Sequence, residues 1–181
     1  MLLHTSNLPS DYKVIAELSY ILYEQQRLFI VGSENSVVFI IKTPSPYPNY
    51  EDEPGLLVFQ TEFPKAAAAW IVDVIENRLW RSAAEGGEPS GKNSVTEVVA
   101  DEKLTLRRTM AVGDAREKGF ILINASRKSV NFDEDYQEIE FSDRLLKEGG
   151  LLDILRQLLE ALAQGTALVM VVPNVLLALW R

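Results

Sequence analysis

A chain of 181 residues with 47% hydrophobic and 24% charged residues has the composition of an ordinary globular protein and is long enough to bury a core. The absence of cysteine excludes a disulfide framework, thiolate metal centres and a cysteine nucleophile, and it favours a reducing compartment, the cytoplasm. The net charge of −8 opposes the approach of nucleic acid or anionic lipid unless a local basic patch compensates for it.

The N-terminal part of the chain lacks the features of a signal peptide and predicts a helix. Residues 1–13 lack the basic start and long apolar run of a signal peptide, so we expect a protein that is not exported. Residues 11–26 follow Ser10, a suitable N-cap. Their apolar side chains lie at helical spacing: Val14, Ile15, Leu18, Ile21 and Leu22. We therefore expect a helix over residues 11–26.

The next segment predicts three strands and a helix. Residues 27–31 and 37–42 are rich in β-branched and aromatic side chains and are separated by a turn sequence, which is typical of a hairpin. The proline-rich residues 43–55 favour a loop, and residues 56–60 predict a third strand. From Pro64 the apolar spacing changes to that of a helix, which extends to about residue 79.

A second segment repeats this order after a linker. Residues 82–93 are rich in Gly, Ser and Pro and predict a flexible linker. Four further strands are expected: residues 95–99, 104–112, 120–125 and 137–141. A leucine-rich helix follows, from about residue 145 or 151 to residue 163, and Gly165 ends it. Residues 166–172 predict one more strand, and residues 175–180 a short apolar tail.

The two segments align without a gap at an offset of 82 residues. Residues 39–43 fall on residues 121–125, and residues 49–53 fall on residues 131–135, so an apolar strand and an acidic loop recur in the same order. A fixed period indicates structural repetition. We therefore expect an α+β fold of two tandem strand-strand-strand-helix repeats, whose antiparallel curved sheets pack on helices, plus the N-terminal helix.

The expected domain organisation follows from these elements, and the two repeats are expected to pack as one unit. Its parts are the N-terminal helix with the first repeat, the linker, the second repeat and the apolar C-terminal tail: residues 1–81, 82–93, 94–165 and 166–181.

Residues suited to catalysis or metal binding are scarce. His4 is the single histidine and lies near a terminus that we expect to fray, and no phosphate-binding glycine motif is present. The acidic runs 51–53 and 133–135 lack the alternating spacing of a calcium loop, so they are expected to be solvated loops. We expect no catalytic residues, no metal and no cofactor, and hence no enzyme.

Aromatic side chains flank the two acidic runs: Tyr47, Tyr50, Phe132 and Tyr136. They are able to stack on the bases of a single-stranded nucleic acid. The alternative is that they anchor each loop on its own sheet.

Basic residues concentrate in the second segment, where they interleave with Thr, Ser and Asn. The candidates for a nucleic-acid-binding strip are Lys103, Arg107, Arg108, Lys118, Arg127 and Lys128. Alternate residues of a strand share a face, so several of them can line one surface. The alternative is an ordinary solvated face, because acids lie near them in the sequence: Asp101, Glu102, Asp114 and Glu117.

The C-terminal tail is unusually apolar. Residues 166–180 contain Pro173 and Asn174 and fall short of the roughly 20 residues that span a bilayer, so we expect no membrane association. An apolar patch of this kind favours contact with a protein partner or a second copy. The candidate contact residues are Val169, Val171, Leu176, Leu177, Leu179 and Trp180.

The order of strands and helix resembles the Pur-alpha and Whirly class of single-stranded nucleic-acid-binding folds. The likeness lies in residues 107–128 (RRTMAVGDAREKGFILINASRK) leading to residues 137–163 (QEIEFSDRLLKEGGLLDILRQLLEALA), and it covers roughly residues 26–163. It implies that the strands form the ligand face and the helices the packing or oligomer face. The residues to which it assigns ligand contact are Arg107, Arg108, Lys118, Arg127 and Lys128.

A second, local likeness concerns residues 151–174 (LLDILRQLLEALAQGTALVMVVPN). This segment is similar to the helix and strand that precede an excisionase-type DNA-binding helix-turn-helix in some bacterial antitoxin-like proteins. The likeness implies a bacterial origin.

Two functions remain open on the sequence. The first is a non-enzymatic protein-protein interaction or assembly module, which the acidic first segment and the apolar tail favour. The alternative is a single-stranded DNA- or RNA-binding protein that uses the basic sheet of the second segment.

Overall fold

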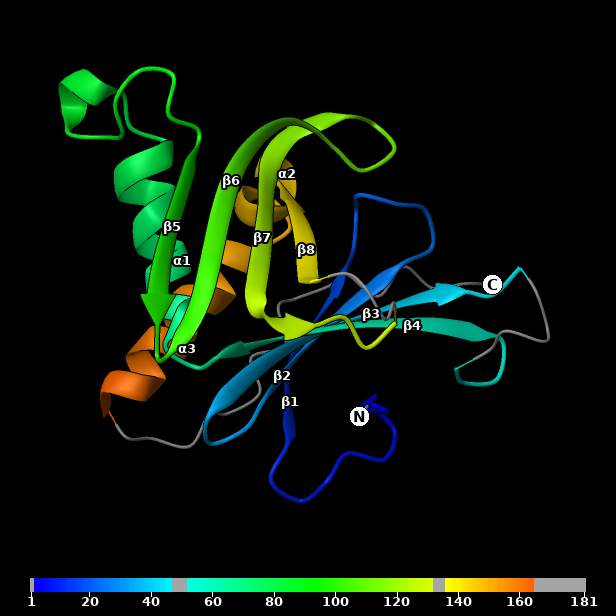
Figure 1. The fold of residues 1–181 in the computed structure, drawn as a ribbon. Helices are drawn as coiled ribbons and strands as arrows, with labels where there is room; N and C mark the ends of the chain where they lie inside the picture. Colours follow the sequence, from blue (N-terminus) through cyan, green and yellow to red (C-terminus); the bar gives the residue numbers. More distant parts are fainter. Residues whose placement is uncertain (1, 47–51, 132–135, 165–181) are drawn as a thin grey trace.

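A computed structural model describes residues 2–46, 52–131 and 136–164, with the side chains of 161–164 excepted. Within these residues the chain forms two antiparallel sheets of four strands each, accompanied by helices (Figure 1). The predicted α+β class is confirmed. No helix of the described residues combines the length and the apolar composition that crossing a membrane requires.

The first sheet has its strands in chain order, each paired with the next. Its strands are β1 (Lys13–Ser19), β2 (Arg27–Gly32), β3 (Ser36–Pro44) and β4 (Leu56–Pro64). Both faces of β3 are buried: Phe39 belongs to the main core, whereas Val38 and Ile40 belong to a smaller cluster that includes Leu3. The near-continuous apolar run of β3 reflects this burial on both faces.

The predicted N-terminal helix is wrong, because residues 13–19 form strand β1. The reason is a β-bulge: Val14 pairs with Val31 and Ala16 with Ile30, which leaves Ile15 without a strand partner. The extra residue puts Ile15 and Ala16 next to each other in the core, and Leu18 follows at strand spacing. The bulge thus produces an apolar spacing that imitates a helix.

The helix predicted over residues 64–79 is confirmed. It consists of α1 (Ala67–Asp73), which continues as the π-helical turn η1 (Val74–Leu79). The predicted linker, residues 82–93, contains the short 3-10 helix η2 (Ala83–Glu85), whose Ser82 and Glu85 form a capping box.

The second sheet also has its strands in chain order. Its strands are β5 (Ser94–Val99), β6 (Glu102–Val112), β7 (Glu117–Lys128) and β8 (Tyr136–Ser142). The helices α2 (Asp143–Lys147) and α3 (Leu151–Gln164) follow. All seven strands that the sequence predicted within residues 27–141 are confirmed. The strand predicted at residues 166–172 lies outside the described residues.

Each half of the chain therefore has four sequential strands followed by a helix, but the gap-free overlay does not hold residue by residue. At an offset of 82 residues Phe39 falls on Ile121, although Phe120 and Leu122 are the fully buried hydrophobic residues of that strand. The pairing differs too, since Ile41 lies opposite Phe59 whereas Ile123 lies opposite Glu138. A gap is needed to align the two halves.

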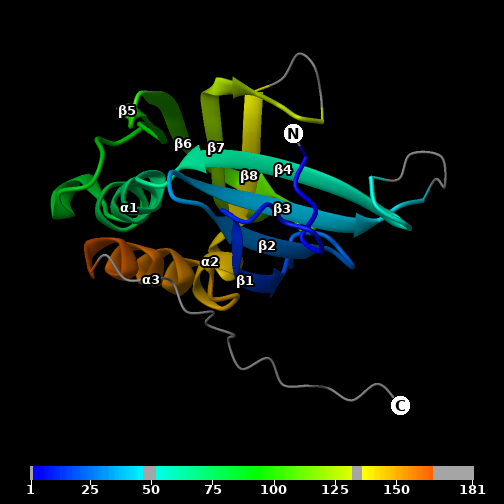
Figure 2. The ribbon, with the colours of Figure 1, turned by 90° about the horizontal axis from the view of Figure 1, so that it is seen from below.

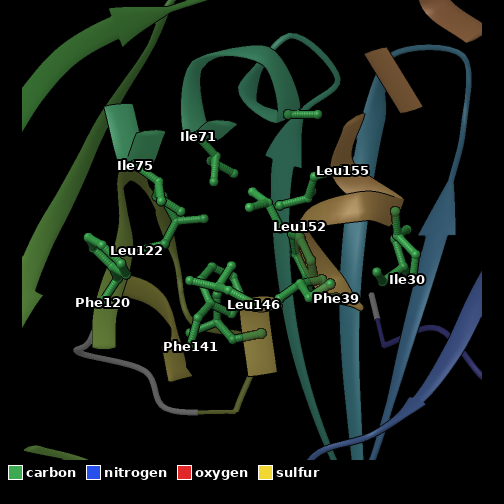
Figure 3. Packing of buried hydrophobic residues seen from close by; sticks show 14 of the residues in the cluster. Ile30, Phe39, Ile71, Ile75, Phe120, Leu122, Phe141, Leu146, Leu152 and Leu155 are labelled. Carbon is green, nitrogen blue, oxygen red and sulfur yellow. The ribbon is translucent and has the colours of Figure 1, made fainter. Parts of the chain in front are cut away.

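The two halves share one main core. The strands of the second sheet run across those of the first, and α1 and α3 lie side by side on one side of the molecule (Figures 1 and 2). Figure 3 shows how side chains of the helices, such as Ile71 and Leu155, meet side chains from both sheets, such as Phe39 and Leu122. Phe39 and Phe141, one from each sheet, lie 5.7 Å apart between ring centroids.

Candidate interaction surface

The outer edge of β4 is bonded by carboxamide side chains of the second half of the chain. The main-chain N–H of Gln60 donates to Oδ1 of Asn131 (3.3 Å), and Nδ2 of Asn131 donates to the carbonyl of Val58 (2.7 Å). One turn residue therefore satisfies two backbone groups of an edge strand, which would otherwise be open to another chain.

Two buried carboxamide side chains bond β4 further along the strand, at Glu62. Its main-chain N–H donates to Oε1 of Gln137 (2.6 Å), and its carbonyl accepts from Nδ2 of Asn124 (3.1 Å). Asn124 is fully buried and Gln137 nearly so. We call the contacts of Asn124, Asn131 and Gln137 with β4 the amide joint. It joins the two sheets and blocks this edge of β4 to a partner.

Arg127, one of the residues predicted to contact nucleic acid, lies in the region of the amide joint. Its guanidinium bridges the carboxylates of Glu62 (2.8 Å) and Glu102 (2.6 Å), which come from different sheets. Burial acts to raise the pKa of Glu102, but hydrogen bonds from Arg127 and Asn124 and the charge of Arg127 outweigh it and lower that pKa. The charge of Arg127 is thus neutralised within the structure.

Arg108 is also neutralised. Its two terminal nitrogens donate to the two carboxylate oxygens of Asp143 (2.5 and 2.6 Å), and its guanidinium lies 4.6 Å from the ring centre of Phe120. Burial acts to raise the pKa of Asp143, but the hydrogen bonds and charge of Arg108 lower it. Arg108 therefore faces the helices on the inner face of the second sheet.

The other predicted basic residues are exposed. Lys103 and Arg107 lie four residues apart on β6 and share the outer face of the sheet, where their strand partners are Val98 and Ser94. Lys118 and Lys128 lie near opposite ends of β7. The six predicted residues do not form one strip. The predicted tail contacts, Val169, Val171, Leu176, Leu177, Leu179 and Trp180, lie outside the described residues.

The outer face of the second sheet changes character from strand to strand. Across one row Thr96 pairs with Thr105, Thr105 with Ile123, and Ile123 with Glu138. The next row runs from Ser94 through Arg107 and Ile121 to Glu140. The face is thus basic and hydroxyl-bearing on β6, apolar on β7 and acidic on β8.

A cavity of about 360 Å³ opens where this outer face meets β3 and β4. We call it the junction groove. Tyr136 at its wall is 60% exposed, whereas the hydroxyl of Thr61 is buried and has no hydrogen-bond partner among the described residues. Its lining residues come from both halves of the chain: Phe39, Ile41, Phe59, Gln60, Thr61, Ile123, Ser129, Asn131, Tyr136 and Glu138.

In the described part of the first acidic loop, Glu53 makes contacts within the protein. Glu53 forms an ion pair with the nearly buried Lys42 (2.6 Å), and His4 lies 3.2 Å from the same carboxylate, so His4 does not lie in a frayed terminus. Burial acts to raise the pKa of Glu53, but hydrogen bonds and charge from Lys42 lower it. Among the described residues no three His, Asp or Glu side chains converge as metal ligands. Residues 133–135, Tyr47, Tyr50 and Phe132 are not described.

Sequence reasoning missed the amide joint and Thr61. A signal was present for Asn124, because a carboxamide that interrupts the apolar run of β7 must find buried partners. Nothing in the sequence indicated the burial of Thr61, because that burial depends on a sheet formed by residues far away in the chain.

Comparisons with known proteins found no counterpart. No protein-family model matches the chain, and searches of curated proteins and of solved structures found none that is significantly similar.

Proposed function

We propose that the protein is a non-enzymatic protein-interaction module that binds a partner protein on the outer face of its second sheet. The observation that supports this most is the row of Thr105, Ile123 and Glu138, in which hydroxyl, apolar and acidic side chains lie next to one another. Protein interfaces combine an apolar centre with a polar rim in this way.

The charges of this region favour a protein over nucleic acid as the binding partner. Arg108 and Arg127 are paired with carboxylates, and Glu138 and Glu140 add negative charge to the same face as Lys103. Phosphate binding requires several uncompensated cations, since counterion release supplies most of the affinity. The net charge of −8 acts in the same direction.

The proposal is tested by placing a bulky charge at the centre of the face. Thr105→Arg is the test variant, and Gln157→Arg on the exposed side of α3 is the control with the same change of charge. We expect quantitative affinity capture from the cells that make the protein to recover the same partner with wild type and Gln157→Arg, and to lose it with Thr105→Arg. Retention of that partner by Thr105→Arg would contradict the proposal.

Single-stranded nucleic acid is the second candidate ligand. It is supported by Lys103 and Arg107 on one face, by the exposed ring of Tyr136 and by the element order, which resembles the Pur-alpha and Whirly class. Fluorescence anisotropy with a labelled oligonucleotide tests it. This function requires salt-dependent binding at micromolar protein that Arg107→Glu weakens, and its absence would exclude it.

Three further properties belong to the proposal. The equal order of elements in the two halves supports an origin by tandem duplication, and the lack of cysteine supports a cytoplasmic location. Self-association through residues 165–181 is supported by their apolar sequence. Light scattering of the full chain and of a chain that ends at Gln164 tests this last point: we expect a larger mass for the full chain, and equal monomeric masses would rule it out.

A further inference from the structure

We infer that the junction groove is a receptor for a single arginine side chain of the partner protein. The inference rests on the proposed function and names the chemistry of its central contact.

The volume and the walls of the groove suit a long side chain. A cavity of about 360 Å³ lies at the lower end of the range for ligand pockets. Ile41, Phe59 and Ile123 line it with apolar surface, which accepts the methylene groups of a long basic residue.

The charge of the residues that line the groove favours a cationic ligand. Glu138 is an exposed carboxylate in the groove, and none of the described residues that line it is basic. An acidic or phosphate-bearing ligand would meet repulsion from Glu138 without a compensating cation. A guanidinium would form a charge-assisted hydrogen bond with the same carboxylate.

The buried hydroxyl of Thr61 supplies the second polar contact. Thr61 is 9% exposed and lines the groove, yet its Oγ1 has no partner among the described residues. A buried hydroxyl without a hydrogen bond is unfavourable, so a donor or acceptor from a ligand is the natural partner.

Tyr136 distinguishes arginine from lysine. Its ring is 60% exposed at the wall of the groove. A planar guanidinium stacks on an aromatic face and still donates sideways to a carboxylate and a hydroxyl, whereas an ammonium is a point charge. The combination of Tyr136, Glu138 and Thr61 therefore fits arginine better than lysine.

The test is an NMR titration of the full-length protein with N-acetyl-arginine amide. The neutral, nearly isosteric N-acetyl-citrulline amide is the control ligand. We expect saturable shifts of the amide signals of Thr61, Tyr136 and Glu138 with arginine, and an affinity for citrulline weaker by about tenfold or more. Equal affinities of the two ligands would overturn the inference.

Two variants locate the contact. Glu138→Gln removes the carboxylate, and Glu160→Gln, on the exposed side of α3, is its matched control. Thr61→Val removes the hydroxyl at nearly constant volume and should not lower urea stability, because that hydroxyl has no partner to lose. We expect both groove variants to weaken arginine binding and Glu160→Gln to leave it unchanged. Unaltered binding by both folded groove variants would also overturn the inference.

One outcome separates this inference from the proposed function. If Thr105→Arg abolishes partner capture while the groove variants bind arginine as wild type does, the interface stands and the arginine receptor is rejected. Thymidine is titrated as a third probe. If it shifts the same amides at lower concentration than the arginine amide does, the groove is a nucleobase site and the arginine inference is wrong.

Discussion

The side-chain amide of Asn124 in β7 donates a hydrogen bond to the main-chain carbonyl of Glu62 in β4, 3.1 Å away. The same amide also donates to the carboxylate of Glu102. Asn124 therefore connects the two sheets at a fully buried position, where hydrogen bonds are not exchanged with water.

Asn124→Leu should destabilise the protein strongly. The substitution leaves the carbonyl of Glu62 without its amide partner and removes a hydrogen bond from Glu102, so we expect a loss of about 2–4 kcal/mol in the free energy of unfolding. Urea denaturation measures it. The control is Asn77→Ala, since Asn77 donates to Asp73 on an exposed helix surface and should cost under about 0.5 kcal/mol. Similar losses for the two variants would show that the joint adds little stability.

Arg107 and Arg108 should differ sharply although they are neighbours in β6. Arg108→Met leaves the partly buried Asp143 without its bidentate partner, and we expect a loss of about 1–3 kcal/mol in unfolding free energy. Arg107→Met affects an exposed side chain and should change stability by less than about 0.5 kcal/mol. Chemical denaturation of both variants measures the difference, and a greater loss for Arg107→Met would contradict the assignment of the two faces.

Acid should weaken the contacts of Glu102 near the boundary between the two sheets. The folded-state pKa of Glu102 is lowered below its ordinary value of 4.5, so its contribution is fully present above that value and is lost as pH falls through the folded-state pKa. We expect the unfolding free energy to fall between about pH 5 and pH 2, and to fall less steeply in Glu102→Gln. An unchanged acid dependence in that variant would show that Glu102 does not contribute.

Alkali should weaken the contact between the β1–β2 connection and β8. The hydroxyl of Tyr20 donates to the carbonyl of Glu140 (2.7 Å), and that of Tyr23 to its carboxylate (2.9 Å). Burial, followed by the charge of Glu140, raises the pKa of Tyr20 well above 10.0, and burial together with Glu140 raises that of Tyr23 to about 12. Because the folded-state values are raised, this stability is present below pH 10 and is lost as pH rises through them.

The alkaline prediction is tested by following phenolate absorbance and unfolding together. We expect Tyr20→Phe to reduce the loss of stability above about pH 10, and the exposed Tyr136→Phe to leave that loss unchanged. If the two variants behave alike, the contact between Tyr20 and Glu140 is not the source of the effect.

Local patterns predicted most of the secondary structure. Seven of the eight strands and the helix over residues 64–79 were correct, because strands and helices have different apolar periods that are visible in short windows of sequence. The exception was β1, where the bulge at Ile15 changes the strand period to one that resembles a helix. Recognising the bulge requires the pairing with β2.

The sequence by itself determined the fold class, the strands from β2 onward and the lack of cysteine chemistry, since these depend on composition and on the spacing of near neighbours. The tertiary structure alone decided which basic residues are exposed. Arg108 pairs with Asp143, and Arg127 pairs with Glu62 of the other sheet. Those partners are remote in the chain, so the burial of a charge and the composition of the outer face become defined only when the two sheets pack together.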